Sequence, residues 1–92
     1  MLTSRISIKL TGFTPSRLVV QPGTAITWTN DTDAPQRVTA RLGEWRSDPI
    51  APGKSFTHIV RLEGAIDFVA PSIPGLLGTI IVSDHADKSG GQ

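Results

Sequence analysis

Few residues of this chain are of the types that carry out chemistry, and they are far apart. The only histidines are His58 and His85, and there is no cysteine among the 92 residues. A zinc or copper site needs several imidazole, thiolate or carboxylate ligands that converge on one ion. His58 belongs to an alternating apolar segment and His85 to a polar one, so they are not expected to share a metal. The lack of cysteine excludes disulfides, thiolate catalysis and iron–sulfur clusters.

Two carboxylates, Asp31 and Asp33, flank Thr32 in a short polar segment. Acid–base catalysis by paired carboxylates needs two different environments and a concave pocket. Aspartates in a short polar loop more commonly cap turns and stay solvated. Since no nucleophile is paired with a base either, the sequence predicts that the protein is not an enzyme.

Charge and aromatic content argue against nucleic-acid binding. Nine basic and eight acidic residues give a net charge of only +1, whereas a nucleic-acid binder carries a strongly basic face. Arg37 and Arg41 are expected on the outward face of one strand, where arginines also discourage edge aggregation. Trp28 and Trp45 are interpreted as core and near-core anchors, not as platforms for base stacking. No apolar run exceeds three residues, so no membrane span is predicted.

The elements that position these residues are predicted to be short strands. Ile6, Ile8 and Leu10 alternate with polar residues, and segment 12–15 is expected to break this run. Segment 17–21 predicts a strand covered on both sides. Nine glycines and seven prolines punctuate the chain. Strands spaced by roughly 8–12 residues indicate a β-sandwich or barrel, and no segment keeps a helical period. Residues 1–84 are expected to form one domain and residues 85–92 a flexible polar tail. Alternation also predicts strands in segments 24–30, 38–42, 56–62, 65–69 and 79–83.

Several turn and aromatic motifs follow one another in a characteristic order. In the first half they are Gly12-Phe13-Thr14-Pro15, Pro22-Gly23-Thr24, Trp28-Thr29-Asn30 and Pro35-Gln36-Arg37-Val38. In the second half they are Pro52-Gly53-Lys54-Ser55-Phe56, Gly64-Ala65-Ile66-Asp67-Phe68 and Gly78-Thr79-Ile80-Ile81-Val82. Together these motifs resemble the cupredoxin family, with spacing nearest to the short-loop amicyanin and pseudoazurin members. The resemblance implies an all-β Greek-key β-sandwich of seven to eight strands.

The resemblance also indicates where the copper ligands would lie. Cupredoxins hold copper with two histidines, one cysteine and a weak axial methionine. The first histidine position falls on Gln36, and the short ligand loop Cys-x-x-His-x-x-Met falls on Ala70, Ile73 and Leu76. All four ligands are replaced, so the chain is predicted to bind no metal and to carry no cofactor. The asparagine of the family pattern falls on Asn30, which is expected to tie the ligand loops together by hydrogen bonds.

The first function that follows is a copper-free binding or structural module. A protein partner would contact the end of the sandwich that carries the former ligand positions Gln36, Ala70, Ile73 and Leu76, through a patch of Pro35, Pro74 and Leu77. Ile73 and Leu76 either fill the former metal cavity or widen this apolar surface, and both can hold at once.

The second function is an electron-transfer scaffold, natural or engineered, from which the copper site has been removed. The resemblance implies a periplasmic or extracellular location after removal of a signal, while a cytoplasmic location and the oligomeric state stay open.

Overall fold

The computed structural model describes residues 2–84. The predicted polar tail, with His85, lies outside the described residues. All regular elements are strands, so the all-β prediction is confirmed. Within residues 2–84 there is no helix of the length and apolarity needed to cross a bilayer. The eight strands are β1 (Thr3–Lys9), β2 (Gly12–Thr14), β3 (Arg17–Val20), β4 (Thr24–Asn30), β5 (Thr39–Ala40), β6 (Ser55–Val60), β7 (Gly64–Val69) and β8 (Leu77–Val82).

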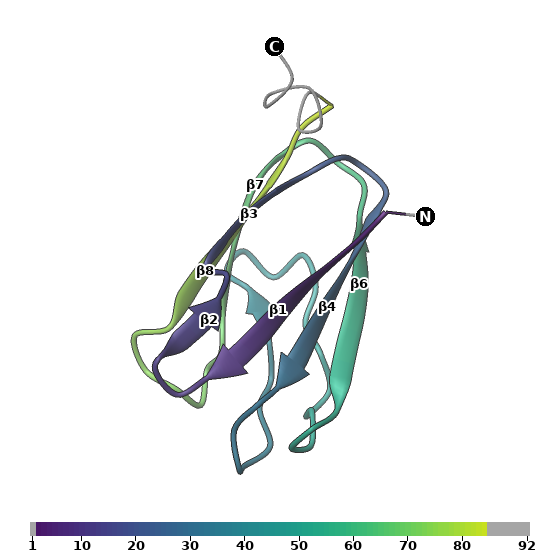
Figure 1. The fold of residues 1–92 in the computed structure, drawn as a ribbon. Helices are drawn as coiled ribbons and strands as arrows, with labels where there is room; N and C mark the ends of the chain where they lie inside the picture. Colours follow the sequence, from purple (N-terminus) through teal and green to yellow (C-terminus); the bar gives the residue numbers. More distant parts are fainter. Residues whose placement is uncertain (1, 85–92) are drawn as a thin grey trace.

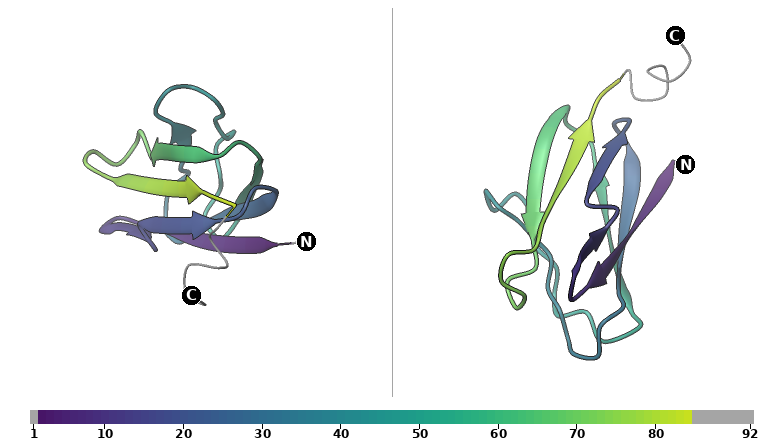
Figure 2. Two further views of the ribbon diagram at one scale, coloured as in Figure 1. Left: turned by 90° about the horizontal axis from the view of Figure 1, so that it is seen from above. Right: turned by 60° about the vertical axis from the view of Figure 1, so that its left-hand side comes forward.

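The strands form two four-stranded sheets, in the orders β2-β1-β4-β6 and β3-β8-β7-β5. Strands β1 and β4 pair in parallel, as do β3 and β8, and the remaining pairs are antiparallel. Because β4 and β5, and likewise β6 and β7, lie in different sheets, the chain crosses repeatedly from one layer to the other. Figures 1 and 2 show β7 and β8 on one side of the molecule and β1 and β4 on the other. This is the predicted Greek-key sandwich.

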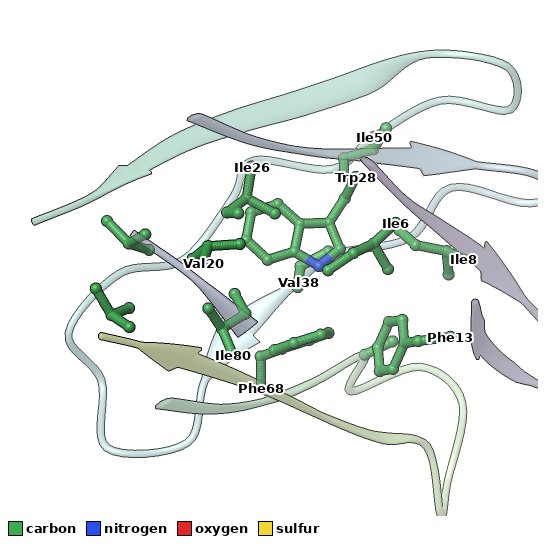
Figure 3. Packing of buried hydrophobic residues seen from close by; sticks show 13 residues of the cluster. Ile6, Ile8, Phe13, Val20, Ile26, Trp28, Val38, Ile50, Phe68 and Ile80 are labelled. Carbon is green, nitrogen blue, oxygen red and sulfur yellow. The ribbon is translucent and has the colours of Figure 1, made fainter. Parts of the chain in front are cut away.

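Strand β4 shows how alternation builds the core. Ile26 and Trp28 are fully buried between the sheets, since successive strand residues point to opposite faces. On the other face Thr27 shares a 2.9 Å hydrogen bond with Thr57 of β6. Figure 3 shows the Trp28 indole in the middle of the core, facing Phe68 from the opposite sheet. The two ring centroids are 5.4 Å apart in an edge-on arrangement, and such aromatic pairs add to the stability that comes from area burial.

The prediction of a strand over segment 38–42 is wrong at its C-terminal end, because β5 ends at Ala40. Val38 and Ala40 are buried, but Leu42 is 88% exposed. The strand stops at Ala40 because the Gly43 amide donates to the Ala40 carbonyl at 2.9 Å. Gly43 has a φ of 81°, a conformation that residues with a Cβ adopt only with strain. The turn therefore points Leu42 outward.

The predictions for segments 12–15 and 17–21 also need correction. Gly12–Thr14, expected to be a break, forms β2 and pairs with β1. Strand β3 is covered on one side only, and Val19 is 44% exposed. The reason is that β3 is an edge strand of a two-layer sandwich, so its outer face has no third layer against it.

Candidate functional site

The loops that carry the predicted ligand positions gather at one end of the sandwich, the lower end in Figure 1. They follow β4, precede β6 and join β7 to β8. Strand β4 points toward this end, and β6 and β8 start from it. The sandwich therefore brings segments 31–38, 51–54 and 70–76 to one end, although they are distant in sequence.

Asn30 links two of these loops. Its side chain is fully buried at the end of β4. The Nδ2 group donates to the Ala34 carbonyl and to the Ile50 carbonyl, each at 2.8 Å. The Oδ1 atom accepts from the Thr32 amide at 2.9 Å and from the Thr32 hydroxyl at 2.7 Å. One amide group thus holds the loop after β4 and the segment before β6 in a fixed relation.

Gln36 lies beside this arrangement and is only 4% exposed. Its backbone exchanges two hydrogen bonds with Ile50, at 3.0 and 2.7 Å. The side-chain Nε2 donates to the Thr32 hydroxyl at 3.1 Å. The buried Oε1 atom has no hydrogen-bond partner among residues 2–84. An unpartnered buried acceptor is costly, so this oxygen offsets part of the stability that burial of Gln36 provides.

The other three former ligand positions follow one another along the β7–β8 loop. Ala70 is buried, and its carbonyl accepts from the Ile73 amide at 2.9 Å. The Ile73 carbonyl accepts in turn from the Leu76 amide at 3.4 Å. Ile73 and Leu76 are half-buried and pack against the core cluster that contains Ala70 and Ile50. The structure therefore joins these three positions in one apolar cluster, and Gln36 adjoins it through its pairing with Ile50.

The residues of the predicted contact patch lie at the surface of the same loops. Pro35 and Pro74 are exposed, and Leu77, the first residue of β8, is 49% exposed. The end of the sandwich thus has half-buried apolar side chains beneath and exposed ones at its rim.

The cupredoxin resemblance raises the question whether these residues could hold copper. A copper ion in this family needs imidazole nitrogens and a thiolate. The four positions offer one amide group, a methyl group and two branched alkyl groups, and the chain has no cysteine at all. Among the described residues no three His, Asp or Glu side chains are grouped closely enough for a metal. The donor set at the predicted ligand positions therefore does not fit copper.

The remaining sequence candidates lie elsewhere and do not converge. His58 is half-buried on β6, with its ring centroid 5.1 Å from the centroid of Trp45. Burial lowers the pKa of His58 below its ordinary value. Asp31 accepts a hydrogen bond from the Ser7 hydroxyl, while Asp33 is exposed. Arg41 pairs with Asp67 at 3.7 Å, with both side chains largely in solvent, where such pairs contribute little.

One surface feature was missed by the sequence interpretation. A hollow of about 530 Å³ lies on the open side of the sandwich, where Trp45, His58, Leu62 and Ile66 form its apolar lining. Alternation predicts a strand over segment 56–62 that includes Leu62, but β6 ends at Val60 and Leu62 is 84% exposed. The exposure of Leu62 could have been predicted from its place between two charged residues and directly before the Glu63-Gly64 turn.

Comparison with known proteins identifies the fold. No protein-family model matches the sequence, and no curated protein matches it. Among solved structures, a purple cupredoxin from Nitrosopumilus maritimus is 24% identical with a TM-score of 0.77, over 87% of this chain and 99% of that one. A methionine-to-glutamine mutant of amicyanin, with Cu(I), is 20% identical with a TM-score of 0.79, over 88% of this chain and 82% of that one. An oxidised methionine-to-leucine mutant of amicyanin is 21% identical with a TM-score of 0.78, over 86% of this chain and 80% of that one.

These likenesses establish that the chain has the cupredoxin fold, as its motifs predicted. The copper-ligand positions predicted from the motifs carry Gln36, Ala70, Ile73 and Leu76 in this chain.

Proposed function

We propose that this protein is a copper-free, non-catalytic binding module that contacts a protein partner through the end of the sandwich described above. The observation that carries the proposal is the apolar character of that end. Leu77 is 49% exposed, and in the sequence it follows half-buried Leu76 and, two residues before that, exposed Pro74. Exposed apolar residues grouped at one place are typical of protein contact surfaces.

The fixed shape of the loops supports a surface ready for binding. The Asn30 side chain restrains the loop after β4 at both Ala34 and Ile50. The two turns of the β7–β8 loop hold Ile73 and Leu76 against the core. A surface that does not have to be ordered on contact loses less conformational entropy when a partner binds.

The test is affinity capture by the immobilised protein, with Leu77→Asp as the disrupting variant and Leu2→Asp as its matched control. The two leucines are 49% and 51% exposed. Leu2 directly precedes β1, and β1 begins at the end of the sandwich opposite the loops (Figure 1). We expect specific proteins to be retained by the parent and by Leu2→Asp and to be lost with Leu77→Asp. Retention of the same proteins by all three forms would contradict the proposal.

The second candidate function is an electron-transfer scaffold, natural or engineered, whose copper site has been removed. It is supported by the cupredoxin fold together with the hydrogen-bonded spacing of positions 70, 73 and 76 along one loop. This candidate is distinguished by restoring the ligands, as described in the Discussion. For either function we propose a periplasmic or extracellular location, with the cytoplasm as the alternative.

A further inference from the structure

The connection between β6 and β7 carries an unusual group of side chains. Residues 61–63 cross from one sheet to the other at the upper end in Figure 1, away from the former copper-site loops. Leu62 is 84% exposed, although a free leucine side chain gains from leaving water. Arg61 and Glu63 on either side of it are also exposed. Within residues 2–84 neither of them forms an ion pair, since the single salt bridge there joins Arg41 to Asp67.

The hollow of about 530 Å³ adjoins this connection, since Arg61, Leu62 and Glu63 are among its lining residues. Trp45, His58 and Ile66 contribute its apolar lining, and its charged rim residues are Glu44, Arg61 and Glu63. The Trp45 Nε1 group is buried without a hydrogen-bond partner among the described residues. Leu62 stands at the rim of the same hollow, so a protruding apolar side chain and an apolar recess lie side by side.

The flank around the hollow has free strand edges. Strand β6 is the last strand of its sheet and pairs with β4 alone among the described strands. Strand β5 pairs with Phe68 and Val69 of β7, and the Arg41 amide donates to the Asp67 carbonyl at 2.9 Å. The first three residues of β7, 64–66, pair with no strand on that side in the described part of the chain. Part of this flank is covered by the segment that carries Trp45, whose ring packs beside His58.

The charges on either side of Leu62 are opposite in sign, so this segment can pair with a second copy of itself. A twofold axis passing near Leu62 would place Arg61 of one molecule opposite Glu63 of the other, and Glu63 of the first opposite Arg61 of the second. Contacts that obey a twofold axis use the same patch on both molecules, so such a patch must match its own copy. Arg61 is the one basic residue among those lining the hollow, and Glu44 adds a second acid there. A rim with like charges at 61 and 63 would repel its own copy, whereas opposite charges at these two positions can match it.

From this relation we infer that the flank binds a second copy of the same chain. Leu62 of each molecule enters the apolar hollow of the other beside Trp45, His58 and Ile66. Arg61 and Glu63 of each molecule pair with Glu63 and Arg61 of the other. The contact leaves the former copper-site end free on both molecules, so it does not depend on the function proposed above.

The test measures self-association by sedimentation equilibrium over a range of protein concentrations. The parent is expected to pass from monomer to dimer as its concentration rises. Arg61→Glu creates a rim with acids at 61 and 63, and Glu63→Arg creates a rim with bases at both positions. Each of these variants alone is expected to dimerise at least about tenfold more weakly than the parent, because like charges then face each other across the axis.

The decisive arm is the equimolar mixture of the two variants. In a mixed dimer acids face bases at both positions, so the mixture is expected to dimerise at least as strongly as the parent. The double exchange Arg61→Glu with Glu63→Arg is expected to restore the homodimer, and Leu62→Asp is expected to abolish it. Arg37→Glu, an exposed arginine at the other end of the molecule, is the control for net charge and should dimerise like the parent.

Circular dichroism checks that each variant keeps the fold, as substitutions at exposed positions should. A parent that stays monomeric at all accessible concentrations would overturn the inference. So would single variants that dimerise as the parent does, or a mixture that stays monomeric although both of its members are folded.

Discussion

The ring of Phe68 occupies the space that a side chain at position 78 would need. Gly78 and Phe68 face each other in the pairing of β7 with β8. A Cβ atom at residue 78 would overlap three carbon atoms of the ring, and even the farthest of them, Cε1, would be only 2.9 Å away. The ring is fully buried, with its centroid 4.7 Å from that of Phe13 and 5.4 Å from that of Trp28. Gly78 is therefore required by core packing, although its φ is ordinary.

Gly78→Ala is expected to lower the free energy of unfolding by about 1–3 kcal/mol, because the confined ring cannot move aside without disturbing its neighbours. Urea denaturation of the purified variant measures this loss. Phe68→Leu provides the control, since it leaves room for the added methyl group. The double variant should then lose less stability than the sum of the two single losses. Additive losses would mean that the ring and residue 78 are not in conflict.

Asn30 is expected to tolerate neither alanine nor aspartate. Alanine leaves the Ala34 and Ile50 carbonyls without their side-chain donor, with a loss of about 2–4 kcal/mol in the free energy of unfolding. Aspartate keeps the oxygen that accepts from Thr32 but turns a carboxylate toward two carbonyl oxygens. Chemical denaturation measures both losses. If Asn30→Asp proves as stable as the parent at neutral pH, the two donated bonds do not hold the loops.

The β7–β8 loop should respond unequally to truncation. Ile73 and Leu76 are half-buried against the core, so Ile73→Ala and Leu76→Ala should each cost about 1–3 kcal/mol, less than a fully buried side chain of the same type. Leu77 is 49% exposed, so Leu77→Ala should cost under about 1 kcal/mol. Thermal and urea melts of the three variants measure the order. Equal small losses at all three positions would show that Ile73 and Leu76 do not fill the former metal cavity.

Restoring the ligands tests the electron-transfer scaffold. Gln36→His, Ala70→Cys, Ile73→His and Leu76→Met together supply two imidazoles, a thiolate and a thioether at the short-loop spacing. We expect this quadruple variant to bind Cu(II) and to show intense visible absorption. Titration with Cu(II), monitored by absorption spectroscopy, measures the binding. Without metal it should be less stable than the parent, because polar groups replace apolar contacts, and copper should recover the loss.

The parent, titrated under the same conditions, should show no visible thiolate band and no tight, stoichiometric binding. A folded quadruple variant that stays colourless with excess Cu(II) would show that the loops do not place positions 36, 70, 73 and 76 around one ion. Tight binding by the parent would contradict the conclusion that its donor set does not fit copper.

Acid should weaken the fold in part through His58. Burial lowers the pKa of His58 below the ordinary value of 6.5, so the folded chain takes up this proton less readily than the unfolded chain does. The free energy of unfolding that depends on neutral His58 is fully present above pH 6.5. It decreases as the pH falls toward the folded-state pKa and is lost below that pKa. Melting temperatures between pH 8 and pH 5 should fall further for the parent than for His58→Gln. Parallel curves would show that the proton on His58 does not affect folding.

Much of the fold is determined by local sequence. Alternation around Ile26 and Trp28 assigns one face of β4 to the core, and the order of the glycine, proline and aromatic motifs indicates the cupredoxin sandwich. The lack of a cysteine ligand is also visible in the sequence, because chemical identity at a position does not depend on folding. A chain without cysteine has no thiolate for copper in any conformation.

The tertiary structure decided which alternating residues are covered. Leu42 and Leu62 continue apolar patterns, yet they are 88% and 84% exposed, since a turn at Gly43 and a sheet-to-sheet connection carry them past the end of the opposite layer. The hollow beside Trp45 and the unpartnered Oε1 of Gln36 are likewise invisible in the sequence. Alternation states which residues share a face of a strand, whereas burial depends on whether another sheet lies opposite that face, and only long-range packing determines this.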